Sequence, residues 1–148
     1  MEHLKVAIGS DHGGFELKEK VIAHLKERGL EYKDFGTYEK KSCDYPVYGR
    51  AVAKSVASGE SEKGIVICTT GLGISMTANK EKGIRCAVCA DTVSAQLTRL
   101  HNDANVLSMG AGIIGENLAI SIVDTFLDTE FSGDERHMRR IRLIEEEA

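Results

Sequence analysis

Residues 64–75 read GIVICTTGLGIS, an unbroken apolar run that ends at Cys68 and is followed at once by a loop of small residues. Such a run is typical of a strand that is buried on both faces, as in a parallel sheet. Residues 73–80, GISMTANK, then predict a short helix. The segment is therefore expected to form a strand, a glycine-rich turn and a helix, as in a βαβ unit.

The same alternation runs along the whole chain. Further strands are expected at residues 5–10, 30–36, 83–90 and 104–110, and further helices at residues 14–29, 48–59, 91–101, 115–128 and 135–148. Strands that alternate with helices pair in parallel and are covered on both faces. We therefore expect an α/β chain with a three-layer αβα, Rossmann-like fold: a five-stranded parallel sheet, helices on both faces and an extra C-terminal helix. No repeat or linker divides residues 1–148, which predicts a single domain.

Composition narrows the class of protein. The chain has 148 residues and a formal net charge of −4, whereas nucleic-acid binders are usually basic. The first residues, MEHLKVAIG, do not resemble a signal peptide, and no apolar run is long enough to cross a bilayer. We therefore expect a cytoplasmic protein that binds neither nucleic acid nor membrane. Thiols stay reduced in that compartment, so all four cysteines are expected to be free: Cys43, Cys68, Cys86 and Cys89.

Ligands of open α/β sheets bind beyond the carboxyl ends of the strands. The residues expected there are SDHGG (10–14), Cys68 with TTGLG (69–73), and residues 110–112. Gly71 and Gly73 allow backbone N–H groups to turn toward an anion, and the positive end of the following helix favours a thiolate at Cys68. A cysteine placed there can act as a base or a nucleophile. The alternative, which the sequence leaves open, is an inert buried cysteine in a tight turn.

Three well-known loops do not fit this segment. A tyrosine-phosphatase loop needs an arginine where the chain has Ile74. A dinucleotide-binding fingerprint needs a third glycine where the chain has Met76, and a P-loop needs a lysine directly after Gly73. Any anion that this loop holds is therefore held in another way.

Two segments with a histidine are further candidates. Asp11 and His12 follow the first strand; Asp11 fits a helix cap, whereas His12, next to two glycines, fits contact with a phosphate or a hydroxyl. His101 and Asn102 end a helix, where both residue types also occur for purely structural reasons. A functional and a structural interpretation remain open for both pairs.

Two motifs involve charge or sulfur. Arg136 and Arg140 stand four residues apart in the expected last helix and share one side of it. Two guanidinium groups can clamp a phosphate, or they can form a solvated basic face beside the acidic residues 145–147. CAVC (86–89) has the CxxC spacing but lies within an expected strand, so a redox or zinc role is not expected.

Taken together, these segments resemble the ribose-5-phosphate isomerase type B family, which also includes galactose-6-phosphate isomerases. The resemblance covers nearly the whole chain. Its motifs keep their order and spacing: IGSDHGGFELK (8–18), DFGT (34–37), DYP (44–46), GIVICTTGLGIS (64–75), ANK (78–80), GIRCAVC (83–89), RLHNDANVLSMG (99–110) and RHMRR (136–140). The resemblance implies a single sugar-phosphate isomerase domain over residues 1–148.

The resemblance also implies roles for individual residues. Cys68 resembles the base that moves a proton between C1 and C2 of the open-chain sugar, and His101 matches the residue that opens the furanose ring. The loop that holds the enediolate matches Thr70 and the amides of residues 69–73, which include Thr69, Gly71, Leu72 and Gly73. Substrate contacts match Asp11, His12 and Asn102, and the phosphate clamp matches Arg136 and Arg140.

The implied activity is that of an aldose–ketose isomerase of the pentose phosphate pathway, which interconverts D-ribose 5-phosphate and D-ribulose 5-phosphate. The resemblance implies no metal and no organic cofactor. It implies a homodimer or homotetramer in which the active site is shared between subunits, with the arginines reaching across from the partner.

Two positions depart from the family pattern. Thr69 stands where a glycine is expected, and Gly112 stands where members of the family often carry an arginine. Both departures leave substrate choice open, so galactose 6-phosphate and allose 6-phosphate remain alternatives. The non-enzyme alternative is a regulatory domain that binds a phosphosugar.

Overall fold

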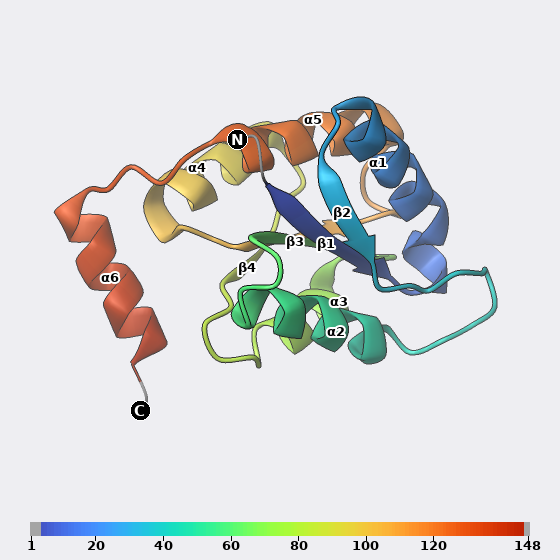
Figure 1. Ribbon diagram of the computed structural model, residues 1–148, viewed down its shortest axis with the longest axis horizontal. Helices are drawn as coiled ribbons and strands as arrows, with labels where there is room; N and C mark the ends of the chain where they lie inside the picture. The colour runs from blue at the N-terminus through green and yellow to red at the C-terminus, as the bar shows by residue number, and fades with distance from the viewer. Residues whose placement is uncertain (1–3, 147–148) are drawn as a thin grey trace.

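The computed structural model describes residues 4–146, in which strands alternate with helices (Figure 1). The strands are β1 (Lys5–Ser10), β2 (Glu31–Asp34), β3 (Lys63–Cys68), β4 (Cys86–Val88) and β5 (Val106–Gly110). The helices are α1 (Phe15–Glu27), α2 (Tyr45–Ala57), α3 (Leu72–Ala78), α4 (Thr92–Asn102), α5 (Glu116–Asp128) and α6 (Glu135–Glu145), and a 3₁₀ turn, η1 (His12–Gly14), joins β1 to α1. Over the described residues, no helix has the length and apolar character needed to cross a membrane.

The five strands form one sheet in the order β2-β1-β3-β5-β4, and all neighbours run parallel. The expected five-stranded parallel sheet is therefore confirmed. Three strands are shorter than expected, among them β5, which begins at Val106 instead of residue 104. Strand β2 ends at Asp34, whose carboxylate accepts the N–H of Gly36, a residue with φ of +93°. Strand β4 begins only at Cys86, because the N–H of Arg85 is bonded to the side chain of Asn105 instead of a strand.

Strand β3 shows why helices cover both faces of the sheet. Ile65 and Ile67 belong to a core that also contains side chains of α1, α4 and α5, whereas Val66 and Cys68 belong to a core with α2 and α3. Burial of each large aliphatic side chain contributes about 1.5–3 kcal/mol, so neither face is stable without its helices. The three-layer αβα arrangement is confirmed.

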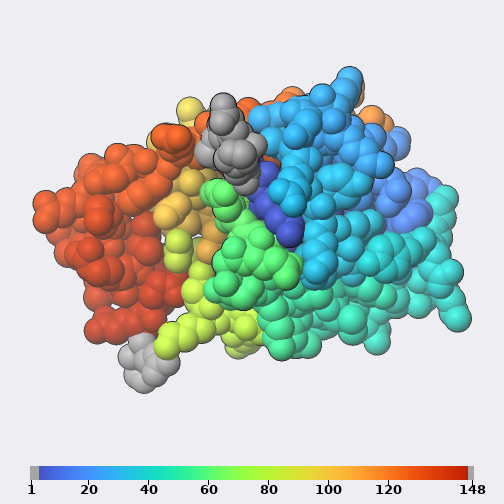
Figure 2. Space-filling model, viewed as in Figure 1, coloured from blue at the N-terminus to red at the C-terminus, as the bar shows by residue number. Residues whose placement is uncertain are grey.

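Helix α6 is the expected extra helix, and it lies at one end of the molecule beside α4 (Figures 1 and 2). Among its described residues only His137 is buried. Met138, Leu143 and Ile144 are exposed, so the chain by itself leaves most of the apolar surface of this helix uncovered. The expected helix ran to residue 148; the observed one ends at Glu145, and residues 147–148 lie outside the described residues.

The strand order places a crevice at the carboxyl ends of β1 and β3. These strands are neighbours, but the chain continues from β1 to β2 on one side and from β3 toward β5 and β4 on the other. Such a switch point in strand order is where open α/β sheets bind ligands. The two segments that follow the strands meet there, since the N–H of Asp11 donates to the carbonyl of Ile67 over 3.3 Å.

Candidate active site

Cys68 is the last residue of β3 and lies at the centre of this crevice. Its side chain is 4% exposed, and its Sγ accepts the backbone N–H of Gly71 over 3.1 Å. Gly71 has φ of +78°, and a Cβ there would lie 2.8 Å from the backbone of Met109 on β5. Only glycine therefore lets the loop turn back tightly enough to aim an N–H group at the sulfur.

The rest of the loop is also tightly built. The N–H of Leu72 donates to the Oγ1 of Thr70 over 3.2 Å, so two of the five expected amides already have partners within the loop. A Cβ at Gly73 would lie 2.5 Å from the ring of Tyr45, which explains the second glycine. Helix α3 has only seven residues, so the individual N–H groups of the loop contribute more to the stabilisation of a negative charge than the helix dipole does.

Asp11 serves as a cap and also borders the crevice. Its Oδ1 accepts the N–H of Gly14 over 3.1 Å, so the structural interpretation of this residue is correct. The same side chain lines a cavity of about 280 Å³ together with Tyr45, Cys68, Thr69, Thr70 and Gly73. A buried carboxylate fixed in this way can also accept a hydrogen bond from a bound hydroxyl.

His12 directly follows Asp11 and is exposed, with one ring nitrogen already engaged. The backbone N–H of Cys43 donates to Nδ1 of His12 over 3.1 Å. A ring nitrogen that accepts a hydrogen bond carries no proton, so the neutral ring holds its proton on Nε2. The exposed His12 therefore offers an N–H donor to a phosphate or a hydroxyl.

Tyr45 is a site residue that the sequence analysis did not single out. It is the first residue of α2, and its phenol ring packs over Gly73 beside Cys68. It lies within the segment DYP (44–46), which contributes to the family resemblance, but its sequence position gave no reason to place its hydroxyl in the crevice. Cys43 was missed in the same way as a partner of His12.

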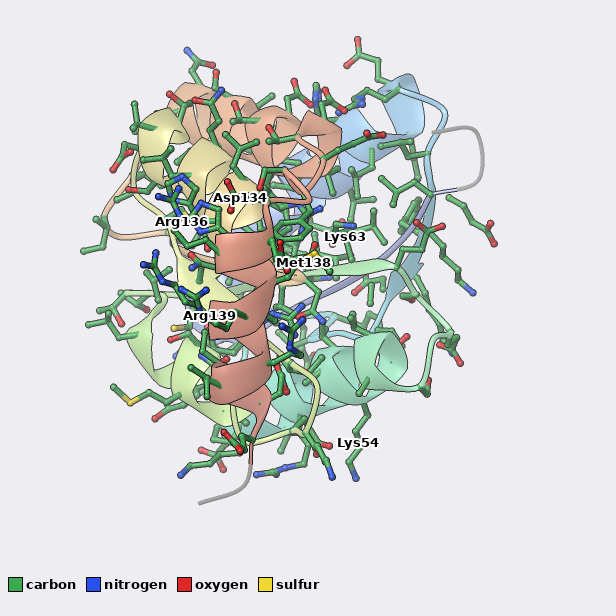
Figure 3. The ribbon with its side chains drawn as sticks, turned by 90° about the vertical axis from the view of Figure 1, so that its left-hand side faces the viewer. Lys54, Lys63, Asp134, Arg136, Met138 and Arg139 are labelled. Carbon is green, nitrogen blue, oxygen red and sulfur yellow. The ribbon has the colours of Figure 1, made fainter. Side chains whose placement is uncertain are left out.

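The remaining candidates form a second group on α4 and α6. The rings of His101 and His137 stack with centroids 4.4 Å apart and planes at 23°. Nη2 of Arg136 lies 3.5 Å from Nε2 of His137. Asp134 caps α6 by accepting the N–H of Arg136 over 2.8 Å, and Figure 3 looks onto this helix with both residues labelled.

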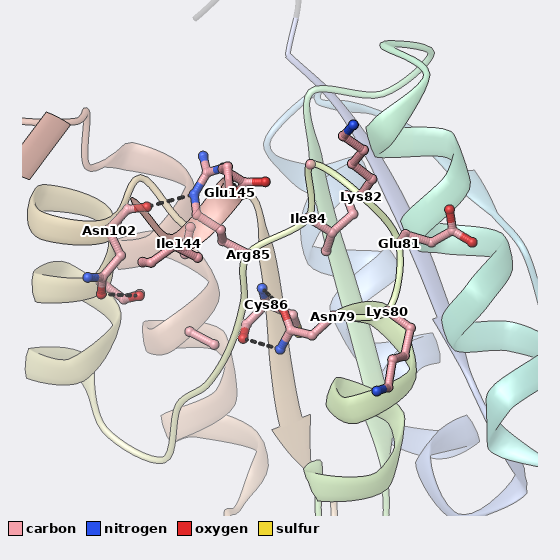
Figure 4. A pocket seen from close by; sticks show the side chains of 14 residues that line it. Asn79, Lys80, Glu81, Lys82, Ile84, Arg85, Cys86, Asn102, Ile144 and Glu145 are labelled. Carbon is pink, nitrogen blue, oxygen red and sulfur yellow. Dashed lines mark hydrogen bonds and ion pairs between the residues drawn. The ribbon is translucent and has the colours of Figure 1, made fainter. Parts of the chain in front are cut away.

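The end of α4 is held in place from the other side by Arg85. Its Nε donates to the carbonyl of Asn102 over 2.9 Å, and its Nη1 donates to the carboxylate of Glu145 over 2.7 Å. These residues border a cavity of about 650 Å³ between α4, the end of α6 and residues 79–87 (Figure 4). The left-handed residue that ends α4 is Asp103, with φ of 44°, whereas Asn102 is still helical.

The two groups lie at opposite ends of the sheet. Cys68 pairs with Gly110 at the carboxyl end of β5, whereas Asn102 comes shortly before Val106, at the amino end of the same strand. Four strand residues span about 13 Å. One chain therefore brings Asp11, His12, Cys68, Thr69 and Thr70 together and holds His101, Asn102 and the arginine helix elsewhere.

The remaining cysteines are free thiols, as expected. Burial, followed by the charge of Asp91, raises the pKa of Cys89 to about 11, and burial raises the pKa of Cys86 still further. Both thiols therefore stay protonated near neutral pH and are poor nucleophiles. Within residues 4–146, no group of three or more His, Cys, Asp and Glu side chains is arranged to hold a metal ion.

Comparisons with known proteins agree with this architecture. The model of the family described as Ribose/Galactose Isomerase matches residues 6–144. Ribose-5-phosphate isomerase B of Escherichia coli is 50% identical over 140 residues, which cover 95% of this chain and 93% of that protein. The solved structure of Clostridium thermocellum ribose-5-phosphate isomerase B superposes with a TM-score of 0.94 at 52% identity and covers 96% of this chain and 95% of that one. A galactose-6-phosphate isomerase subunit of Clostridium acetobutylicum is 38% identical, with coverage of 95% and 82%.

Proposed function

The chain belongs to the ribose/galactose isomerase family and is an isomerase, and we propose that it interconverts D-ribose 5-phosphate and D-ribulose 5-phosphate at a site shared by two copies of the chain. The observation that carries this proposal is the sulfur of Cys68, which is bonded to the N–H of Gly71 and lines a cavity at the switch point of the sheet. Three relatives named for ribose 5-phosphate are 45%, 50% and 52% identical to this chain, against 38% for the relative named for galactose 6-phosphate.

In the proposed reaction, Cys68 is the base for the carbon-bound proton. Its thiolate takes the proton from C2 of the open-chain aldose, and the electron pair moves through a C1–C2 double bond onto the C1 oxygen. The resulting enediolate needs hydrogen-bond donors where its charge develops, and Thr69, Thr70 and Gly73 of the loop border the same cavity. Transfer of a proton between O2 and O1, and return of the proton from the thiol to C1, yield the ketose.

His101 opens the sugar ring in this proposal. It takes the proton of the O1 hydroxyl and delivers a proton to the ring oxygen as the bond between C1 and that oxygen breaks, which leaves the aldehyde. A free imidazole has a pKa of about 6.5, so it can accept and donate protons near neutral pH. His101 is exposed in the single chain and is therefore free to meet a sugar there.

Arg136 and Arg140 are the proposed phosphate clamp, with Asn102 as a further substrate contact. Both arginines are exposed on the first turns of α6. Guanidinium groups bind phosphate through several charge-assisted hydrogen bonds. The binding energy of the phosphate then holds the flexible open chain against the base.

The shared site is supported by the placement of the two groups. Cys68 and His101 lie at opposite ends of one sheet, so one chain cannot present both to the same sugar. In a dimer with twofold symmetry, each end of one chain can face the opposite end of the other. Large apolar side chains are exposed on the elements near the edge strand β4 and on α6: Leu72, Met76, Val88, Val93, Leu97, Met138, Leu143 and Ile144.

Complementation between two inactive variants tests the shared site. Cys68→Ala and His101→Asn are each expected to be inactive alone. After unfolding, mixing and refolding, half of the dimers contain both variants, and one of their two sites has an intact Cys68 and His101. Recovery of about a quarter of wild-type turnover is expected, and no recovery means that each site is built from one chain.

Turnover of three sugar phosphates, without added metal, tests the substrate. Ribose 5-phosphate is expected to be preferred over allose 6-phosphate and galactose 6-phosphate. Preference for a hexose phosphate keeps the chemistry but overturns the proposed substrate.

The proposal includes no metal or organic cofactor and treats the chain as one isomerase domain. It also places the chain in the cytoplasm, where its free thiols stay reduced.

A further inference from the structure

The helix that carries the arginines is anchored by a histidine. His137 is 8% exposed and is the only buried residue in the described part of α6, and its ring lies face to face with that of His101. Apolar side chains of the same helix, such as Met138, remain exposed. An aliphatic or aromatic residue would anchor a helix without the cost of burying a titratable ring. Packing alone therefore does not account for a histidine at this position.

The groups around His137 disfavour its protonation. His101 faces it from α4, and Arg136, Arg140 and Asp134 face it from the first turns of its own helix. Burial of the ring, and then the charges of His101 and the arginines, lower the pKa of His137, while Asp134 opposes this effect. A guanidinium can only donate hydrogen bonds, so Arg136, 3.5 Å from Nε2, also favours an unprotonated nitrogen there.

We infer that His137 is a positioning residue for His101: its neutral ring forms the platform that orients the His101 imidazole and leaves the proton of the stacked pair to His101. This inference rests on the proposed role of His101 in ring opening. Two imidazolium ions with centroids 4.4 Å apart repel each other, so the pair holds one proton much more readily than two. Since burial and the neighbouring charges disfavour a proton on His137, the member that accepts and returns the proton is the one exposed to the sugar.

The arginines connect this pair to the substrate. In the free protein their positive charges disfavour a proton on His137. A phosphate dianion bound by Arg136 and Arg140 offsets those charges, so the pair accepts a proton more readily once a phosphate is in place. The proton needed for ring opening then becomes available when a phosphorylated sugar is bound.

NMR titration of the imidazole C–H resonances tests the pair without any turnover. Spectra of His137→Phe and His101→Phe assign the two rings. The midpoint of His137 is expected to rise in His101→Phe by about 0.7 pH unit or more, which is the effect of a unit charge at this distance even at the dielectric of water. Saturating inorganic phosphate is expected to raise the midpoint of the pair in the wild-type protein. Unchanged midpoints in both experiments overturn the inference.

Kinetics separate positioning from simple anchoring of α6. His137→Ala is expected to lower kcat about tenfold while KM for ribose 5-phosphate changes less than about threefold, because the arginines remain. His137→Phe keeps a flat ring under His101, so this variant is expected to retain most of the wild-type kcat that His137→Ala loses. The control is Ile141→Ala, one turn further along α6 and half-buried, which removes packing from the helix and keeps both histidines.

The outcomes distinguish this inference from the proposed function. If His137→Ala raises KM and leaves kcat unchanged, as a loosened helix would, His137 is an anchor and the inference is wrong. If the wild-type protein converts none of the sugar phosphates, the proposed function fails, while the NMR titration still decides whether the two histidines share a proton.

Discussion

The backbone N–H of Gly71 donates to the Sγ of Cys68 over 3.1 Å, across a loop that only glycine can form. A thiolate is stabilised by such a donor, and the bond also fixes the direction of the sulfur toward the cavity it shares with Asp11 and Tyr45. This geometry supports the proposal that Cys68 acts as a base.

The first prediction concerns the removal of this sulfur. Cys68→Ala is expected to lower kcat at least about 10³-fold, because the base for the C2 proton is lost, while the dissociation constant of ribose 5-phosphate changes little. Turnover by ketose formation and binding by calorimetry measure the two effects. Cys89→Ala is the control: burial raises the pKa of Cys89 to about 11, and its activity is expected to be normal. An unchanged rate in Cys68→Ala would remove Cys68 as the base.

The second prediction concerns the phosphate clamp. Arg140→Ala is expected to raise KM for ribose 5-phosphate about tenfold or more, because a charge-assisted contact with the phosphate is lost. Arg142→Ala, an exposed residue two positions further along α6, is the control and is expected to change KM less than about twofold. Equal affinity of the Arg140 variant and the wild-type protein for phosphorylated sugars would contradict the clamp.

The sequence predicted the sheet and the place of Cys68 because both depend on local patterns. Apolar runs that end in glycine-rich turns recur at regular intervals, and the carboxyl ends of parallel strands meet at one edge. The local patterns did not place His101 at the amino ends of the strands, although the order of the elements along the chain implies this position. Helix α4 leads into β5, so its end must lie at the amino ends of the strands. The packing of His137, Cys43 and Tyr45 depends on side-chain contacts across long sequence separations, which no local pattern specifies.

The third prediction concerns a buried charge behind the site. Lys18 is 0% exposed, and its ammonium lies 2.8 Å and 2.9 Å from the two carboxylate oxygens of Asp34. Asp34 also accepts the N–H of Gly36, at the start of the connection that brings Cys43 to His12. Lys18→Met is expected to lower the free energy of unfolding by about 3–5 kcal/mol, because an unpaired carboxylate is left at the edge of the core.

Urea denaturation measures this effect against a matched lysine. Lys20, two residues along the same helix, pairs with Glu116 at 2.7 Å but is 54% exposed. Exposed pairs are screened by solvent, so Lys20→Met is expected to leave the denaturation midpoint unchanged. A similar response of both variants would mean that the Lys18–Asp34 pair contributes no more than a surface contact.

The fourth prediction concerns Thr69, one of the two departures from the family pattern. Its Oγ1 occupies the place that a Cβ at Gly13 would need, and its Cγ2 lies 3.1 Å from the position of a Cβ at Gly112. The threonine thus fills space between the segments that follow β1 and β5, beside Cys68. Thr69→Gly is expected to widen the cavity and to raise kcat/KM for allose 6-phosphate relative to ribose 5-phosphate about tenfold.

Two further variants separate the bulk of Thr69 from its hydroxyl. Thr69→Ser keeps the hydroxyl and removes the methyl. If Thr69→Ser changes the preference between the two sugar phosphates as Thr69→Gly does, that preference is set by the bulk of the threonine alone. Gly13→Ala is expected to impair turnover in the wild-type background, because its Cβ collides with Oγ1 of Thr69, and to be tolerated when Thr69→Gly removes that atom. If Gly13→Ala is equally harmful in both backgrounds, Thr69 does not shape this wall of the cavity, and the substrate preference must be set elsewhere.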